Sequence, residues 1–521
     1  MRIAIIGAGF SGSVLATELA RSAPASVDLC LVGMPESFGR GVAYGEARPE
    51  HLLNVRARDM GATQDKPVEF ARWLNLTRRA EEGFLPRLVY GEYLYSRLQP
   101  AAQTSLASFT QVQQEVVAID REGTAFRVML ADGSDFIADK VVRAVGALPP
   151  QRLQGVGPRL LVDPGYIAWP WQRDLRGRDA LAQVPAEARV LVIGSGLTMA
   201  GTVVTLLRRG HRGPITALSR HGLLPRPHLE EPGPPVALPP NVLHVLNSAD
   251  VRLLLRTLRA LAPIVPDWRG LVDALRPCLQ GYWKTLPDEE RSRFMRHLRS
   301  YWEVFRHRLA PSVHRELEEL RRQGQLKIRA GRLLRARRGE TAIEVVLRER
   351  GRSHAEFEQY DVLVRATGLD TDIERTSHPL VGQLRDAGTI SADPFGLGLR
   401  ANARYEVLDR HGAPVRGLYC LGPLLRGQLW ETPRSPGCGW PRASWPRSCC
   451  GRWRPPGSRR GRGRGWPRPP VRRRGFRGAC GQASLAGQGR GAQVGRGFPC
   501  RRRSRARHLT REMLHRSIGL G

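Results

Sequence analysis

The residues that point most directly to chemistry are glycines, at two places far apart in the chain. Residues 7–12 read Gly-Ala-Gly-Phe-Ser-Gly and directly follow the apolar run Ile3–Ile6. In a strand–turn–helix unit, the first glycine allows a tight turn, the second lets a pyrophosphate approach the backbone, and the third lets helix and strand pack closely. The N–H groups at the start of the helix then face the anion. The alternative is a tight strand-to-helix turn that holds no ligand. The residues predicted to bind the first dinucleotide are Gly7, Gly9, Phe10, Ser11 and Gly12.

A second unit of the same kind begins at Val190. The apolar run Val190–Ile193 leads into Gly-Ser-Gly-Leu-Thr-Met, in which Met199 takes the place of the third glycine. The next apolar run, residues 215–218, ends in Ser-Arg-His without an acid. An acid there would favour NAD, whereas serine and arginine suit a ribose 2′-phosphate, so we expect NADPH with Arg220 as its clamp. The alternative is an arginine that faces solvent after a strand. The residues predicted to bind the second dinucleotide are Gly194, Gly196, Leu197, Thr198 and Arg220.

Two dinucleotide units in one chain are more specific than one. One nucleotide can be a tightly held flavin and the other a visiting nicotinamide, which together suffice to move a hydride. At the end of the second apolar run, residues 27–32, the acid that usually holds a ribose hydroxyl is missing, and the nearest is Glu36. The adenosine contact therefore stays unassigned.

A glycine-rich stretch and two neighbouring motifs carry a family resemblance. They read G-R-G-V-A-Y-G at 39–45, H-L-L-N-V at 51–55 and D-K-P-x-x-F-x-x-W-L at 65–74, followed by P-R-x-x-Y-G-x-Y-L at 86–94. This pattern resembles the FAD/NAD(P)-binding proteins, and within them the group of FAD-dependent urate hydroxylase and an aspartate N-monooxygenase. The similarity runs from residue 1 to about residue 432. It implies bound FAD in contact with Arg40, Gly41 and Asn54; an ordinary glycine-rich surface loop is the alternative for residues 38–45.

Two later motifs extend the resemblance. The stretch D-x-x-x-x-A-T-G, which ends in Gly368, resembles the linker through which two-dinucleotide flavoproteins cross back between domains. Many flavoproteins then have Gly-Asp where the flavin ribityl chain binds, but this chain has Gly422-Pro423, as in the family. The resemblance therefore implies that backbone groups near Gly422 hold the flavin.

The predicted fold class is α/β, with two Rossmann-like dinucleotide-binding domains, a β-meander over residues 110–145 and a helical insertion over 240–325. The predicted boundaries are 1–150 for the first part of the FAD domain, 151–340 for the NAD(P) domain with its insertion, and 341–432 for the return to the FAD domain. In the insertion, Arg306, His307 and Arg308 follow aromatic residues at helical spacing. Either this is an amphipathic helix packed on a sheet, or the three residues line a pocket for an anionic substrate.

Charge is distributed unevenly along the chain. The formal net charge is +34, and residues 433–521, with 23 arginines and one acid, leave only +12 for the first 432 residues. We interpret 433–521 as a disordered basic tail, the product of a frameshift in a GC-rich gene; the alternative is an arginine–glycine arm that binds nucleic acid. The prediction is therefore no nucleic-acid partner.

The function favoured by these observations is an FAD-dependent, NADPH-using monooxygenase of a small polar substrate, anionic if the Arg-His-Arg segment binds it, with O₂ as co-substrate. The alternatives are an NADPH-dependent reductase or dehydrogenase without oxygen insertion, and a non-catalytic nucleotide-binding protein. The cofactor would carry the chemistry, so no catalytic residue is assigned. The chain has no Cys-x-x-Cys, so neither a metal site nor a redox dithiol is predicted. It has no apolar run of membrane-spanning length and no signal peptide, which predicts no membrane partner and a cytoplasmic location.

Overall fold

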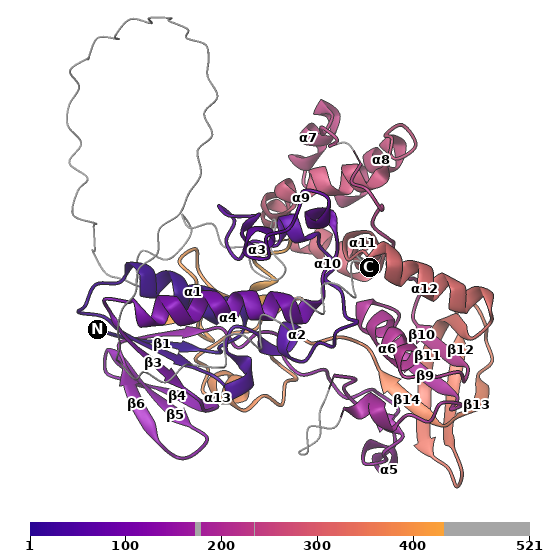
Figure 1. The fold of residues 1–521 in the computed structure, drawn as a ribbon, viewed down its shortest axis with the longest axis horizontal. Coiled ribbons are helices and arrows are strands. Elements are labelled where there is room, and N and C mark those ends of the chain that lie inside the picture. Colours follow the sequence, from indigo (N-terminus) through magenta and orange to yellow (C-terminus); the bar gives the residue numbers. More distant parts are fainter. Residues whose placement is uncertain (172–178, 234, 432–521) are drawn as a thin grey trace, which may run out of the picture.

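The structure is a computed structural model that describes residues 1–171, 179–233 and 235–431. Residues 172–178, 234 and 432–521 lie outside the described residues, and the predicted basic tail lies outside them with the last of these ranges. Figure 1 shows two sheets with their helices at opposite ends of the molecule and a group of helices above and between them.

The first unit is built on a six-stranded sheet in the order β15-β16-β7-β1-β2-β3. All neighbouring strands are parallel except β15, which is antiparallel to β16. The apolar residues of β1 are at most 3% exposed, as expected for a parallel strand that is covered on both faces. The strands are β1 (Arg2–Ile6), β2 (Asp28–Val32), β3 (Ser108–Val112), β7 (Lys140–Arg143), β15 (Glu406–Leu408) and β16 (Pro414–Cys420).

Different elements cover the two faces of this sheet. On one face, α1 (Phe10–Ser22) and α4 (Arg87–Gln103) pack side by side and bury Leu15, Leu19 and Leu98 against the strands. On the other face lie α13 (Pro379–Asp386) and a three-stranded antiparallel meander. The meander consists of β4 (Val116–Glu122), β5 (Ala125–Leu130) and β6 (Asp135–Ala138), and it confirms the predicted meander between the halves of the first domain.

The second unit is a seven-stranded sheet in the order β13-β12-β11-β10-β9-β14-β8. Its parallel half resembles the first sheet and includes the first half of β11, whose second half forms an antiparallel meander with β12 and β13. The strands are β8 (Tyr166–Ile167), β9 (Val190–Ile193), β10 (Ile215–Ser219), β11 (Leu326–Arg338), β12 (Ile343–Glu349), β13 (Glu356–Tyr360) and β14 (Val362–Arg365). On one face of this sheet, α6 (Leu197–Arg208) and α12 (Pro311–Arg322) pack together.

The two sheets together confirm the predicted α/β fold with two dinucleotide-binding units. One predicted boundary has to be corrected: the sequence places the return to the first unit at residue 341. The register of β14 pairs Val362 with Val190 in β9, because the apolar run 362–365 fills the position beside that strand. The return to the first unit therefore follows Arg365.

The helical insertion lies between β10 and β11. Its helices are α7 (Pro240–Leu246), α8 (Val251–Leu261), α9 (Trp268–Thr285), α10 (Asp288–His297) and α11 (Arg299–Arg306), followed by α12. Two of them begin at an aspartate cap: Asp250 accepts from the backbone N–H groups of Arg252 and Leu253, and Asp267 accepts from that of Arg269. Their apolar faces form one cluster, which also contains Trp430.

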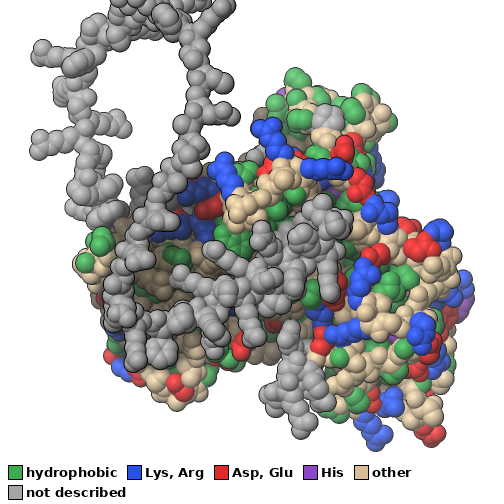
Figure 2. Space-filling model, viewed as in Figure 1, with side chains coloured by type: hydrophobic (Ala, Val, Ile, Leu, Met, Phe, Trp, Pro, Cys, Tyr) green, Lys and Arg blue, Asp and Glu red, His purple; other side chains and the backbone are tan. Residues whose placement is uncertain are grey.

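Short elements complete the fold: α2 (Gly41–Gly45), α3 (Glu69–Trp73), α5 (Pro158–Leu161), and the 3₁₀ helices η1 (Pro35–Ser37), η2 (Ala57–Asp59), η3 (Ala80–Glu82), η4 (Ala180–Gln183) and η5 (Pro423–Leu425). Among the residues that the structure describes, no helix is long and apolar enough to cross a bilayer. On the face in Figure 2, basic and acidic side chains are interspersed over the coloured part of the surface.

Candidate dinucleotide sites and the pocket between them

The first glycine turn connects β1 to α1 and is sterically closed to side chains at two positions. Gly7 has φ +105°, and a Cβ atom there would lie 2.4 Å from the carbonyl oxygen of Ala144. A Cβ atom on Gly12 would lie 1.8 Å from the carbonyl oxygen of Gly7. These two glycines therefore have the roles that the motif predicts, turn formation and close helix–strand packing.

Gly9 caps α1 and faces the glycine-rich stretch that follows β2. A Cβ atom on Gly41 would lie 2.9 Å from the Cα atom of Gly9, so the two backbones approach closely. The Phe10 ring packs against the apolar cluster that contains Tyr90, with 6.4 Å between the two ring centroids. Phe10 and Ser11 thus offer the turn their backbone N–H groups, which begin a helix without an acid in its first turn.

The other residues predicted to contact FAD differ in whether their polar groups already have partners within the protein. Arg40 is already paired: its Nε lies 2.8 Å from Glu92 of α4, and its guanidinium stacks over Tyr95. Asn54 lines the pocket described below. Gly422 has φ +101° and turns the chain from β16 into η5, so only its backbone faces the ligand side.

The second glycine turn repeats the first one closely. Gly194 has φ +120°, and a Cβ atom there would lie 2.3 Å from the carbonyl oxygen of Ala366. A Cβ atom on Gly196 would meet no atom within 4 Å, so the start of α6 is open. Met199 is fully buried in the core beneath α6, where it replaces the third glycine of the motif.

The strand beside each glycine turn is repeated as well. The chain leaves β7 as Arg-Ala-Val-Gly and β14 as Arg-Ala-Thr-Gly, and the alanine of each contacts the first glycine of its turn. The closing glycines, Gly146 and Gly368, have φ values of +79° and +78°, and a Cβ atom on either would meet no atom within 4 Å. The two units therefore present equivalent open backbone at equivalent edges of their sheets.

Arg220 follows β10 on the same edge as the second turn. Its side chain is exposed and forms no ion pair with any residue that the structure describes. Nearby, His221 Nδ1 lies 3.0 Å from Arg350 Nη1, and burial and the surrounding arginines lower the pKa of His221. The Arg220 side chain, which is expected to bind the 2′-phosphate, thus forms no ion pair with a described residue, and the arginines around it favour an anion.

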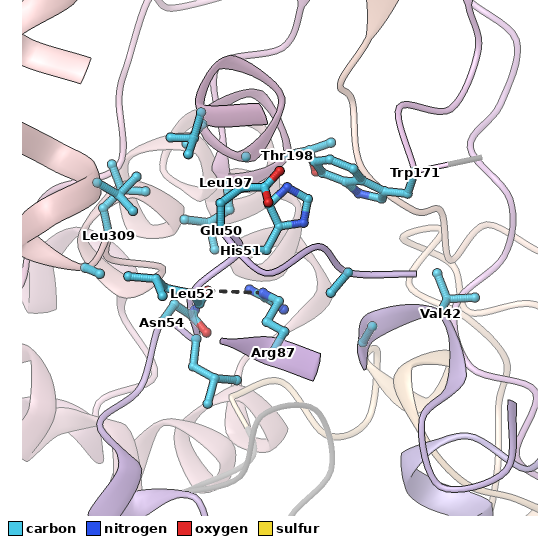
Figure 3. A pocket seen from close by; sticks show the side chains of 18 of the residues that line it. Val42, Glu50, His51, Leu52, Asn54, Arg87, Trp171, Leu197, Thr198 and Leu309 are labelled. Atoms are coloured by element: carbon cyan, nitrogen blue, oxygen red, sulfur yellow. Dashed lines mark hydrogen bonds between the residues drawn. The ribbon is translucent and has the colours of Figure 1, made fainter. Parts of the chain in front are cut away.

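A pocket of about 260 Å³ lies between the two units. Figure 3 shows Leu197 and Thr198 of α6 on one side, Val42 of α2 and the segment 50–54 on the other, and Trp171 and Leu309 at its borders. Three predicted residues, Asn54, Leu197 and Thr198, meet in this pocket. Because they come from both predicted sites, the pocket is where the two bound nucleotides would approach each other.

Inside the pocket, His51 is held as a neutral ring. Its Nδ1 accepts from the backbone N–H of Arg48 (3.1 Å), and its Nε2 lies 2.9 Å from Thr205 Oγ1, which donates to Glu50 (2.7 Å). The ring packs edge-on against Trp171, with 4.4 Å between ring centroids. Burial lowers the pKa of His51 to about 4. His51 is therefore a structural link between the 46–56 segment and α6, with both ring nitrogens engaged.

Two arginines line the pocket with different partners. Arg87 donates from Nε to the carbonyl oxygen of Leu52 (3.2 Å), and burial lowers its pKa. Arg308 is 3% exposed, and its guanidinium is paired with Asp273 at 2.6 and 3.1 Å. The positive charge available to a ligand in the pocket is therefore that of Arg87.

The Arg-His-Arg segment does not converge on the pocket. Arg306 pairs with Glu431 (2.5 Å), His307 with Glu303 (2.9 Å) and Arg308 with Asp273. Of the three, only Arg308 lines the pocket. Of the aromatic residues of α11, Trp302 packs into the apolar cluster of the insertion, whereas Tyr301 is 40% exposed. This favours the amphipathic-helix interpretation, except that the helix packs on other helices and not on a sheet.

Several lining residues were not assigned a role from sequence, namely Glu50, His51, Arg87, Trp169 and Trp171. His51 and Arg87 belong to the motifs that carry the family resemblance, which was the available signal. Trp169 and Trp171 lie in a segment without a recognisable pattern, and only the fold brings Trp171 against α6 and Trp169 against Glu46. The need for glycine at position 201 likewise follows only from the fold, because a Cβ atom there would lie 2.9 Å from the Trp171 ring.

Comparison with known proteins supports this architecture. Residues 4–148 match the family described as FAD-NAD(P)-binding, which confirms the resemblance for that part of the chain. No curated protein sequence matches the chain significantly.

Solved structures with the same fold cover most of the chain. The ornithine N-hydroxylase of Kutzneria sp. 744, with reduced FAD, NADP⁺ and L-ornithine, is 17% identical, with a TM-score of 0.51, and the match covers 83% of this chain and 94% of that one. The reduced ornithine hydroxylase of Pseudomonas aeruginosa is 15% identical, with a TM-score of 0.52 and coverages of 86% and 96%. The FAD-bound cadaverine monooxygenase of Erwinia amylovora is 13% identical, with a TM-score of 0.50 and coverages of 82% and 89%.

Proposed function

We propose that this protein is an FAD-dependent, NADPH-using monooxygenase that hydroxylates a small polar amine. The observation that carries the proposal is the duplication of an open glycine turn, together with one pocket that is lined by the second turn and by the glycine-rich half of the first unit. The proteins with the same fold support it, since those named above act on ornithine or cadaverine.

The first turn fits the diphosphate of FAD. Gly41 leaves no room for a side chain beside Gly9, a Cβ atom on Gly9 would make only ordinary contact at 3.5 Å, and the start of α1 carries no competing acid. A helix start of this kind binds anions through its unpaired N–H groups. Gly7, Gly9, Phe10, Ser11, Gly12 and Gly41 would hold the diphosphate, and Asn54 and the Gly422 turn would lie beside the rest of the cofactor.

The second turn fits NADPH. Gly196 is open on the ligand side, and Leu197 and Thr198 line the shared pocket. Arg220 would bind the 2′-phosphate through charge-assisted hydrogen bonds. When bound, NADPH supplies the hydride and the flavin activates O₂.

In the pocket, the residues of the chain would bind and orient the substrate and the cofactors and would exclude water. Glu50 is the only acid among the described residues that line the pocket, and its carboxylate accepts from Thr205. A carboxylate attracts an ammonium group, which supports an amine substrate, and the charge of Arg87 in the same pocket leaves room for an anionic group on that amine. His51 does not act as a base, since both of its ring nitrogens are hydrogen bonded within the protein.

The test is a visible spectrum of the purified full-length protein, followed by NADPH oxidation in an oxygen electrode. We expect flavin absorption bands and, with an amine such as ornithine, lysine or cadaverine, a hydroxylated product that accounts for the O₂ consumed. Peroxide as the sole product with every amine would indicate a reductase. A colourless protein that gains no flavin on incubation with FAD would contradict the proposal. The cytoplasmic location stays a prediction.

A further inference from the structure

Three arginines without a carboxylate partner lie close together in the second unit. Arg220 follows β10, Arg332 lies in β11 and Arg350 follows β12. All three side chains are exposed, and none forms an ion pair with any residue that the structure describes. By contrast, Arg352 on the same turn as Arg350 pairs with Glu349 (3.0 Å). Positive charge that the protein leaves unpaired at one place attracts an anionic ligand to it.

Hydrogen bonds connect this place to the second glycine turn. Ser195 of the turn places its Oγ 2.8 Å from Ser219 Oγ and 2.6 Å from the carbonyl oxygen of Leu223, which fixes the loop after β10 beside the turn. Ser219, the last residue of β10, lies opposite Ala330 of β11. The carbonyl oxygen of Ala330 accepts from the backbone N–H of Arg350 (2.8 Å). The backbone of Arg350 is therefore only one strand away from the end of β10.

His221 holds the side chain of Arg350 toward this loop. Its Nδ1 accepts from Arg350 Nη1 at 3.0 Å, since a guanidinium group can only donate. On the side of α11, the His221 ring lies 5.7 Å from the Tyr301 ring, measured between centroids. Burial and the charges of Arg350, Arg220 and Arg332 lower the pKa of His221. The ring is therefore neutral at pH 7 and free to accept this hydrogen bond.

We propose that Arg350 binds the 2′-phosphate of NADPH together with Arg220, and that His221 positions the Arg350 guanidinium for this contact. A phosphate monoester carries a charge of about −1.5 to −2 at pH 7, so one guanidinium neutralises only part of it and two neutralise it. Each guanidinium can donate two parallel hydrogen bonds to phosphate oxygens. The proposal rests on the proposed function, because it takes NADPH as the second nucleotide, and it adds a specificity residue from outside the dinucleotide-binding motif.

The test is isothermal titration calorimetry of the full-length protein with 2′,5′-ADP and with 5′-ADP, which lacks the 2′-phosphate. This measurement needs no turnover. The wild type should bind 2′,5′-ADP at least about tenfold more tightly than 5′-ADP. Arg350→Ala should weaken 2′,5′-ADP binding about tenfold, or about 1.4 kcal/mol, and leave 5′-ADP binding unchanged. Arg352→Ala, on the same turn, is the matched control and should change neither affinity.

A second pair of variants tests the positioning role of His221. His221→Leu removes the acceptor for Arg350 and should weaken 2′,5′-ADP binding about threefold, whereas His221→Asn keeps an acceptor and should restore most of it. Equal affinities of these two variants would overturn the positioning role.

The outcomes also separate this proposal from the proposed function. A wild type that binds both nucleotides equally would show that the protein does not select NADPH, and both proposals would fail on that point. A wild type that prefers 2′,5′-ADP, with an Arg350→Ala variant that keeps the whole preference, would overturn the role of Arg350 alone. Equal weakening of both nucleotides by Arg350→Ala would overturn it as well, because the 2′-phosphate would then not be what Arg350 contacts.

Discussion

At Gly9 and Gly196 the missing side chain leaves backbone open to a ligand, whereas at Gly7, Gly12 and Gly194 it avoids a collision with a carbonyl oxygen. The two groups of glycines therefore make different predictions. Substitution in the second group disturbs the fold, because the neighbouring backbone has to move to admit a side chain. Substitution in the first group changes the ligand site and leaves the core as it is.

Gly9→Asp should lower FAD occupancy at least about tenfold, a loss of about 1.4 kcal/mol, because a carboxylate would face the diphosphate at the start of α1. Gly196→Asp is the matched change at the second turn. It should raise the KM for NADPH by a similar factor and leave the flavin in place. Flavin absorbance and steady-state kinetics measure both effects. Equal flavin content in wild type and Gly9→Asp would refute the assignment of the first turn.

Arg220→Ala should raise the KM for NADPH roughly 10- to 150-fold and the KM for NADH much less, since a charge-assisted contact to phosphate contributes about 1.5–3 kcal/mol. Arg212, paired with Glu187 at the other end of the same sheet, provides a control. Arg212→Ala should change neither constant. If Arg220→Ala weakens both nucleotides equally, Arg220 does not contact the 2′-phosphate.

One buried histidine, His51, and one half-buried histidine, His228, should make stability depend on pH. Burial lowers the pKa of His51 and of His228 to about 4, below the value of about 6.5 expected in the unfolded chain. Between about pH 6.5 and 4 the unfolded state binds more protons, so the free energy of unfolding falls as the pH falls.

His228→Gln removes one of these groups and keeps a donor for the carbonyl oxygen of Asn54, which His228 Nε2 contacts at 3.1 Å. The loss of stability between about pH 6.5 and 4 should shrink by up to about 3 kcal/mol. Denaturant unfolding at several pH values measures it. Parallel pH profiles for wild type and variant would contradict the expectation.

At the scale of elements, α6 connects the two units. Its first turn lines the pocket, and its last turns hold the segment 46–56 of the first unit through Thr205. An ion-pair network adds to this contact, because Asp179 binds both Arg48 and Arg209, and these partners and a backbone hydrogen bond lower the pKa of Asp179 to about 2 against the opposing effect of burial. The orientation of α6 therefore depends on the glycine-rich half of the first unit.

Substitution of two fully buried threonines on α6 can distinguish the contribution of this contact between the units from the stability of the helix itself. Thr205→Val should cost about 1–3 kcal/mol, since it leaves polar atoms of Glu50 and His51 without a partner. Thr202 donates to the carbonyl oxygen of Thr198 within the helix. Thr202→Val should therefore cost less than about 1 kcal/mol. Denaturant unfolding compares the two variants, and equal losses would show that the contact between the units contributes nothing.

At the scale of the whole molecule, the last described residues are packed into the folded body. Trp430 is 3% exposed, and Glu431 accepts from Trp302 Nε1 (2.9 Å) and from Arg306 Nε (2.5 Å). These contacts fasten the return segment of the first unit to the helical insertion. Parts of the fold that are distant in sequence are thus held together near the end of the described chain.

The sequence predicts that residues 433–521 are disordered, so their deletion should leave the melting temperature within about 2 °C of that of the full chain, a difference of less than about 1 kcal/mol. Calorimetry of both forms, with FAD content measured in parallel, provides the test. A melting temperature several degrees lower after deletion would show that this segment contributes to the folded core.

The sequence by itself determined the two turns and the fold class, because a buried strand, a glycine turn and a helix are local features that leave a local pattern. The positions of Gly7, Gly12 and Gly194 followed from that pattern, and the contacts of their backbones agree with it. The β-meander was predictable for the same reason, since alternation of apolar residues is a property of single strands.

Tertiary structure alone decided what the charged side chains do. Arg40, Arg306 and Arg308 have the residue type that binds anions, but each lies opposite a carboxylate from a distant part of the chain and is neutralised there. Arg87 lines the pocket without such a partner among the described residues. Ion pairing and burial depend on which elements pack together, and the spacing of residues along one element does not contain that information.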